Sequence, residues 1–246
     1  MTGAGDSSLG GGAFPPTRWS IILDAGDANA EARRRALDEL CRLYWKPVYA
    51  YIRAVRRVER HEAKDLTQDF FVEVMEGNLL SRASPEKGTF RGYLRGALHL
   101  FLLEQRRQAG ALKRGGGRRT LTLDDDEVRR IDQLTAAPGA TPEQAFDRQW
   151  MHSVIDIAVQ DLRDEMARTG REIYFRVFDR HQLHPPAGDP PSHAQLAREF
   201  TLRESDVNHY LAECRRKLRE CISGRIRDYV SSPGEVEEEV RGLFSA

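Results

Sequence analysis

The sequence predicts an all-α protein with two small helical domains joined by a flexible linker. Apolar residues recur at helical spacing along most of the chain, and no segment shows a convincing strand-like alternation. Stretches rich in Gly or Pro, near residues 110–117 and 183–192, interrupt this helical pattern. The length of 246 residues suits either one large domain or two small ones.

The domain boundaries follow from changes in composition along the chain. The first residues are rich in Gly and Ser, so we expect them to be disordered. A basic, Gly-rich stretch and an acidic cluster separate the two helical regions, and the last residues are again acidic. The expected divisions are a disordered N-terminal extension at 1–13, a first helical domain at 14–112, an acidic linker at 113–140, a second helical domain at 141–230 and an acidic C-terminal tail at 231–246.

The first domain is expected to contain four helices. Thr17 is a suitable N-cap for the first helix, because apolar residues follow it at helical spacing. The second helix covers 31–55, and Pro47 inside it is expected to kink or break it, since proline lacks a backbone N–H. The third helix covers 61–77 and the fourth covers 90–107.

The second domain is expected to begin with a helix that runs to about Arg168. Thr141 and Gln144 form the sequence pattern of a capping box, and Pro142 suits the first helical position. A further helix is expected at 171–181. The Pro-rich stretch after it is expected to form a loop, and two more helices follow that loop.

The formal net charge of zero conceals an uneven distribution of charge. Residues 42–119 hold 17 Lys and Arg against 8 Asp and Glu, whereas residues 120–190 hold 8 against 14. A basic segment beside an acidic one suggests that the basic segment faces a polyanion, although dispersed and solvated arginines would give the same counts.

The sequence does not indicate a membrane, secreted, metal-binding or catalytic protein. No apolar run approaches the roughly 20 residues that span a bilayer, and the N-terminus lacks a secretory signal pattern, so a cytoplasmic protein is expected. Cys41, Cys214 and Cys221 lack metal-ligand spacing, and we interpret them as buried apolar side chains. The seven histidines are scattered without a nucleophile motif or a phosphate-binding loop, so we expect no enzyme activity, metal or cofactor.

Residues 192–222 have the pattern of a helix-turn-helix. Ser192 is expected to cap the first helix, and Thr201 lies in the turn, where many such motifs have Gly, so a slightly different turn is expected. Outward residues early in the second helix suit base edges in the major groove, and later arginines suit phosphates. The candidate DNA contacts are Arg203, Glu204, Ser205, Asn208, His209, Arg215, Arg216 and Arg219. An ordinary helical hairpin with a charged surface is the alternative.

The helix expected at 61–77 carries polar side chains along one face. Their spacing places them opposite Leu66, Phe70 and Val74. These polar residues are Asp65, Gln68, Asp69 and Glu73. Such a face suits a basic helical partner, and a merely solvated face is the alternative.

The helix expected at 90–107 combines an apolar face with a basic one. The residues expected to pack inward are Phe90, Tyr93, Leu94, Ala97, Leu98 and Phe101. Basic side chains lie on the other face with Leu102 among them, and this interleaving suits single-stranded nucleic acid. The candidate nucleic-acid contacts are Arg91, Tyr93, Arg95, His99, Arg106 and Arg107. A membrane-surface helix would show the same two faces.

Three of these segments resemble, in order, conserved regions of bacterial RNA polymerase sigma factors. The residues that match the second region are Asp65, Leu66, Gln68, Asp69, Phe71, Phe90, Leu94 and Arg107. The departures are Lys64 for an acidic residue, Tyr93 for Trp, Leu100 for Asn and Glu104 for Asp. The helix-turn-helix resembles the fourth region. The best agreement is with the two-domain extracytoplasmic-function group, over about residues 14–225.

This resemblance implies a polymerase subunit rather than an enzyme. It implies that the domain at 14–112 binds core RNA polymerase through the polar face at Asp65 and the melted downstream promoter element through 90–107. It implies that the helix-turn-helix of the domain at 141–230 reads the upstream element. Promoter DNA and core polymerase are the implied partners, with no small-molecule substrate, and an anti-sigma protein is left open as a further partner.

A stand-alone helix-turn-helix regulator is the main alternative function. Such a regulator would bind palindromic sites as a dimer and make no contact with polymerase. No heptad pattern for dimerisation is visible in the sequence, and this alternative leaves the first domain without a role. The tail at 231–246 has no counterpart in the resemblance, and its acidic and apolar pattern suggests that it docks on the basic surface of its own chain.

Overall fold

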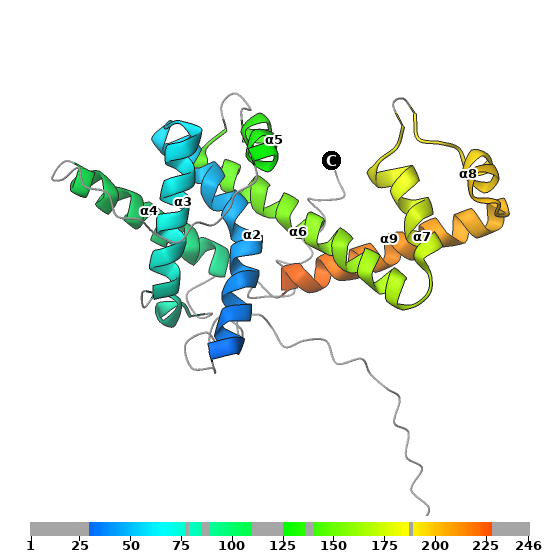
Figure 1. The fold of residues 1–246 in the computed structure, drawn as a ribbon, viewed down its shortest axis with the longest axis horizontal. Helices are drawn as coiled ribbons and strands as arrows, with labels where there is room; N and C mark the ends of the chain where they lie inside the picture. The colour runs from blue at the N-terminus through cyan, green and yellow to red at the C-terminus, as the bar shows by residue number, and fades with distance from the viewer. Residues whose placement is uncertain are drawn as a thin grey trace, which may run out of the picture.

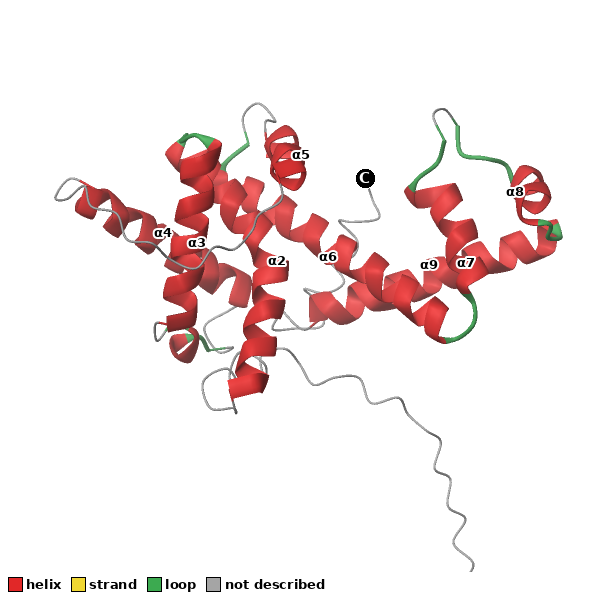
Figure 2. Cartoon of the chain, in the orientation of Figure 1, coloured by secondary structure: helices red, strands yellow, loops and turns green. Residues whose placement is uncertain are grey.

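The structure is a computed structural model that describes residues 30–76, 79–84, 89–109, 125–135, 140–186 and 189–227. The helices that Figure 1 labels are α2 Ala30–Arg56, α3 Arg60–Glu76, α4 Phe90–Ala109, α5 Asp125–Thr135, α6 Pro142–Arg168, α7 Glu172–Phe178, α8 His193–Phe200 and α9 Glu204–Arg227. The described residues contain no strand (Figure 2), which confirms the predicted all-α class. None of these helices is both long and apolar enough to cross a membrane. The expected helix after Thr17, the extension at 1–13 and the tail at 231–246 lie outside the described residues.

Two hydrophobic clusters form along the molecule, and helix α6 belongs to both. In Figure 1, α2, α3 and α4 gather on one side, α7 and α8 lie on the other, and α6 runs between them. Helix α9 returns beside α6, and Ile222 near its end joins the cluster of the N-terminal helices. The second cluster contains the end of α6, from Leu162 to Met166, together with α7, α8 and most of α9.

Helix α2 runs from Ala30 to Arg56 through Pro47, so of the expected kink or break at this proline, the break does not occur. Proline removes one backbone hydrogen bond from a helix interior. Here Pro47 is itself buried, and Val48 and Tyr49 beside it are fully buried. Burial of apolar surface on both sides of the proline offsets the lost hydrogen bond.

The first half of α6 packs on α2 through a stripe of apolar side chains four residues apart. The stripe consists of Phe146, Trp150, Val154 and Ala158, each at most 1% exposed. The ring centroid of Phe146 lies 6.4 Å from that of Tyr44 and 6.3 Å from that of Tyr51, both on α2. The sequence assigned α6 wholly to the second domain, whereas in the structure its first half shares the core of the N-terminal helices.

Helix α5 lies within the segment that was expected to be a flexible linker. Val128 and Ile131 of α5 are buried in the N-terminal cluster. The carboxylate of Asp132 accepts a hydrogen bond from Arg53 Nε at 3.0 Å and a further one from Arg60. The expected flexibility is therefore not confirmed for residues 125–135, which form a helix held against α2 by apolar and charged contacts.

Ion pairs tie α6 to its neighbours along its length. Lys46 Nζ of α2 lies 3.1 Å from an Asp156 oxygen and 3.2 Å from a Glu127 oxygen of α5. Lys217 Nζ of α9 lies 2.6 Å from a Glu165 oxygen. These side chains are partly exposed, so each pair contributes modestly to stability, but together they fix the register of the packed helices.

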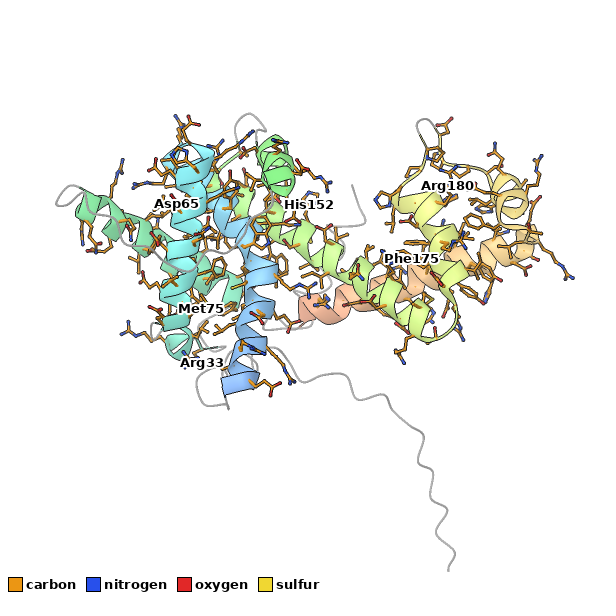
Figure 3. All side chains as sticks on the ribbon, viewed as in Figure 1. Arg33, Asp65, Met75, His152, Phe175 and Arg180 are labelled. Atoms are coloured by element: carbon orange, nitrogen blue, oxygen red, sulfur yellow. The ribbon has the colours of Figure 1, made fainter. Side chains whose placement is uncertain are left out.

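Replacing Phe146 by Ala is expected to lower the free energy of unfolding by about 3–5 kcal/mol, because it leaves a cavity between α6 and α2. Urea denaturation followed by circular dichroism measures this loss. His152→Ala is the matched control, since His152 is exposed on the same helix (Figure 3) and its removal is expected to cost within about 0.5 kcal/mol. Equal losses for the two variants would contradict the packing of α6 on α2.

The three cysteines are free thiols, as expected for apolar side chains in the core. Cys214 is fully buried, and Cys41 and Cys221 are half-buried. Burial raises the pKa of the Cys214 thiol to about 12 and, with a contribution from Asp38, that of Cys41 to about 11. These thiols therefore stay neutral at physiological pH.

The raised pKa of Cys214 is expected to make the folded chain lose stability in alkali. In the unfolded chain a cysteine thiol has a pKa near 8.5. The contribution of neutral Cys214 to the free energy of unfolding is therefore fully present below about pH 8, and it is lost as the pH rises toward the folded-state pKa. Urea denaturation at about pH 7.5 and about pH 10 measures the decline. In Cys214→Ala the decline is expected to be shallower, and an equal decline in the two proteins would contradict this role of the thiol.

Candidate nucleic-acid and partner surfaces

Helices α8 and α9 and the short turn between them lie where the sequence predicts a helix-turn-helix. Ser192 caps α8, as expected, because its Oγ accepts a hydrogen bond from the Gln195 N–H at 3.3 Å. The Gln195 side chain in turn accepts a hydrogen bond from the Ser192 N–H at 2.7 Å, which completes a capping box. Leu196 and Ala197 of α8 are buried against α9, and the small Ala197 allows the two helices to approach closely.

The turn between α8 and α9 has the left-handed conformation at Thr201, with φ 56° and ψ 49°. The Leu202 N–H donates to the Ala197 carbonyl at 2.8 Å, and the Thr201 N–H donates to the Arg198 carbonyl at 3.4 Å. This is the hydrogen-bond pattern of a Schellman motif, which usually has Gly at its left-handed position. The expectation of a different turn is therefore wrong, since the chain forms the usual turn with Thr in it.

The start of α9, together with Arg203 directly before it, exposes the side chains that were expected to contact base edges. Arg203, Glu204, Ser205, Asn208 and His209 are all exposed. The opposite face of α9 is buried through Val207, Leu211 and Cys214. Because one face of α9 is buried and the other is exposed, the start of α9 can enter the groove of a partner such as DNA.

Two local contacts hold the start of α9 in place. The Asp206 carboxylate accepts a hydrogen bond from the Arg203 N–H at 3.2 Å. The ring of Tyr174 on α7 stacks on Tyr210 with centroids 3.7 Å apart, and the His209 ring meets the Tyr174 ring edge-on at 5.8 Å. The aromatic contact restricts His209 before any partner binds.

The arginines farther along α9 are exposed but already make contacts within the chain. Arg215 Nε donates to the Gln182 side chain at 3.3 Å. Arg216 Nη2 lies 2.7 Å from a Glu213 oxygen, and a second Arg216 nitrogen pairs with Glu220. The hydrogen bond from Arg216 holds the pKa of the Glu213 carboxyl below its usual value. A phosphate would therefore compete with two carboxylates for Arg216, which the sequence did not indicate.

The polar face predicted on α3 is present. Asp65 and Glu73 are exposed, and Gln68 and Asp69 are half-buried. Leu66, Phe70 and Val74 are buried on the opposite face, as expected. Figure 3 labels Asp65 on this face of α3. At the end of α3, Arg33 Nη2 of α2 donates a hydrogen bond to the Met75 carbonyl at 2.9 Å, which ties the two helices together (Figure 3).

Helix α4 buries a wider apolar face than expected. Phe90, Leu94, Leu98 and Phe101 are buried, as the periodicity predicted. Leu102 is only 3% exposed, so its expected place on the basic face is wrong. Because α4 packs against both α2 and α3, its buried arc includes one more position. Leu100 and Leu103 are instead exposed, at 67% and 42%.

Arg91 and Arg95 do not lie on an open outer face, as was expected, but point to the start of α6. Arg95 Nη1 donates to an Asp147 carboxylate oxygen at 3.1 Å, and Arg91 Nε lies 3.5 Å from the other oxygen. The guanidinium carbon of Arg91 is 4.4 Å from the centre of the Trp150 ring. The two arginines lie one helical turn apart, and α6 covers that turn.

The remaining candidate residues of α4 line open grooves. His99 is exposed, with Nδ1 3.5 Å from the Tyr51 hydroxyl, and Arg106 and Arg107 are exposed. Tyr93 is half-buried and donates a hydrogen bond from its hydroxyl to the Leu79 carbonyl. A groove of about 1280 Å³ runs along α4, and its lining includes Glu73, Arg95, His99, Leu100, Leu103 and Arg107. A smaller groove of about 250 Å³, lined by Val55, His99 and Arg106 among others, adjoins it.

Asp147 and Trp150 are the residues of this surface that sequence reasoning missed. They lie three residues apart on α6, so helical periodicity places them on one face. Periodicity does not show which helix that face meets, and the contact with α4 depends on the packing of α6 on α2. In the part of the chain that the structure describes, no group of three or more His, Cys, Asp or Glu side chains is arranged to hold a metal ion.

Comparisons with family models, with curated proteins and with solved structures find no match to this chain.

Replacing Thr201 by Gly is expected to stabilise the chain by up to about 1 kcal/mol, because a Cβ atom is unfavourable at a left-handed position. Thermal unfolding measures the gain as a rise in Tm of up to about 2–4 °C. Thr201→Ala is the control, since it keeps the Cβ and is expected to give no such gain. A glycine variant less stable than the alanine variant would show that the Thr201 backbone is not strained.

Proposed function

We propose that this chain is a sigma subunit of bacterial RNA polymerase, of the two-domain extracytoplasmic-function type. Its helix-turn-helix would read an upstream promoter element, and α4 with its grooves would hold the melted downstream element. The exposed face of α3 would bind core polymerase. The proposal places the protein in the cytoplasm, with core polymerase and promoter DNA as its partners and with no enzyme activity, cofactor or small-molecule substrate.

The observation that carries this proposal is the geometry of α8 and α9. The left-handed turn at Thr201 and the capping box at Ser192 support a helix-turn-helix. Arg203, directly before its second helix, and Ser205 and Asn208, early in that helix, are exposed. Arginine suits guanine and asparagine suits adenine in the major groove. A helix with both types at its exposed start is suited to sequence reading.

Two further surfaces support a polymerase subunit over a simple DNA-binding protein. Exposed carboxylates on α3, at Asp65 and Glu73, form a surface that suits a basic partner. The grooves along α4 join basic side chains to exposed apolar ones at Leu100 and Leu103. Mixed surfaces of this kind suit single-stranded nucleic acid, since the backbone is held by charge and the bases by apolar contact.

The proposal is tested by mixing the purified chain with core RNA polymerase and a library of promoter sequences and mapping the transcription starts. Specific initiation from sites with two spaced elements is expected. Within this assay Asp65→Lys with Glu73→Lys is expected to weaken core binding by about tenfold or more, because two attractive charges become repulsive. Asn208→Ala is expected to relax sequence preference at one upstream position by about 1–3 kcal/mol and to leave core binding unchanged.

Asp189→Lys is the control for charge reversal, because Asp189 is exposed in the loop before α8 and away from α3. Its core affinity is expected to match that of the unchanged chain. Binding to DNA with no effect on core polymerase would overturn the proposal and favour a stand-alone helix-turn-helix regulator.

A further inference from the structure

Two guanidinium groups of α4 meet one carboxylate of α6. Arg95 Nη1 is 3.1 Å from one oxygen of Asp147, and Arg91 Nε is 3.5 Å from the other. The arginine side chains are 32% and 19% exposed, and that of Asp147 is 41% exposed. The site is therefore partly desolvated and still open to a ligand from solution.

Trp150 fixes the position of one of these guanidinium groups. The carbon of the Arg91 guanidinium lies 4.4 Å from the centre of the Trp150 ring, within the range of a cation–π contact. Trp150 is 1% exposed and packs in the N-terminal cluster, so the ring is a rigid support. Arg91 is thus held in place whether or not Asp147 is bound to it.

The one carboxylate of Asp147 neutralises only one of the two guanidinium charges, and an oxyanion can take its place. A backbone phosphate, like a carboxylate, has two charged oxygens that can accept hydrogen bonds from two guanidinium groups. Arg95 also lines the groove of about 1280 Å³ along α4, so the two arginines lie at the edge of the surface where exposed Leu100 and His99 are found.

We propose that Arg91 and Arg95 form a clamp for one backbone phosphate of single-stranded nucleic acid, and that Asp147 occupies this clamp when no strand is bound. The inference rests on the proposed function only in naming the strand as melted promoter DNA. Asp147 then acts as an internal competitor that lowers the affinity of the free chain for nucleic acid. Trp150 is a positioning residue, which holds Arg91 for the incoming phosphate.

Exchange of partners at this site needs only a rotation of the Asp147 side chain. That side chain is 41% exposed, so it can turn toward solvent when a phosphate takes its place. Trp150, three residues farther along α6, stays in the buried stripe and keeps its contact with Arg91.

The clamp is tested with the full chain and a short fluorescein-labelled single-stranded DNA, by fluorescence anisotropy over a range of salt concentrations. Asp147→Asn is expected to tighten binding by about five- to tenfold with little change in the dependence of log Kd on log salt, because the same phosphate is held in both proteins. Asp156→Asn is the control, because it also removes one carboxylate from α6. The Asp156 carboxylate pairs with Lys46 rather than with α4, so this variant is expected to change DNA binding less than about twofold.

A double-variant background separates the clamp from a general charge effect. With Arg91→Gln and Arg95→Gln present, Asp147→Asn is expected to have no effect on binding beyond that of Asp156→Asn. The inference is overturned if Asp147→Asn behaves like Asp156→Asn in the unchanged chain, or if it still tightens binding in the double-glutamine background.

A second variant tests the clamp even where Asp147→Asn fails to fold. Arg95→Gln alone is expected to weaken binding by about fivefold, whereas Arg163→Gln, at an exposed arginine of α6, is expected to have little effect. Equal effects of these two variants would overturn the clamp. None of these measurements contains polymerase, so a failure of the clamp and a failure of the sigma-subunit proposal give separate results.

Discussion

The packing of α6 on α2 is the interaction on which the arrangement of the other elements depends. Phe146, Trp150, Val154 and Ala158 present one fully buried stripe to the N-terminal helices. Burying two aromatic and one β-branched side chain removes a large apolar area from water and is worth several kcal/mol, on the order of 1.5–3 for each large side chain. The ion pairs of Lys46 and of Asp132 then align helices that this apolar contact has already brought together.

This packing also determines which basic residues are available to a partner. Arg91 and Arg95 lie under the start of α6 and meet Asp147, whereas His99, Arg106 and Arg107 extend beyond it and stay exposed. The basic face of α4 is thus divided into a part that α6 covers only partly and a fully open part. A basic residue on the outer face of an isolated helix loses exposure when a second neighbouring helix packs over that face.

The sequence predicted those features that depend on local chemistry. Helices α3, α4 and α6 were placed within a few residues, because apolar periodicity and the capping boxes at Thr141 and Ser192 are local signals. The polar face of α3 and the exposed start of α9 followed from the same periodicity. The sequence left open whether Pro47 kinks or breaks α2, and it did not predict the usual turn at Thr201, because tertiary packing and hydrogen bonds outweigh the local preference of a single residue.

The rest of the candidate site depends on contacts between distant segments. Asp147 lies more than 50 positions from Arg91 and Arg95, and their pairing requires the correct rotation of α6 about α2. Leu102 was assigned to the outer face of α4 because the second helix that covers it is not visible from periodicity. Local sequence windows indicate that the helices exist. How the helices pack against one another depends on burial between distant segments, which no single window of the sequence shows.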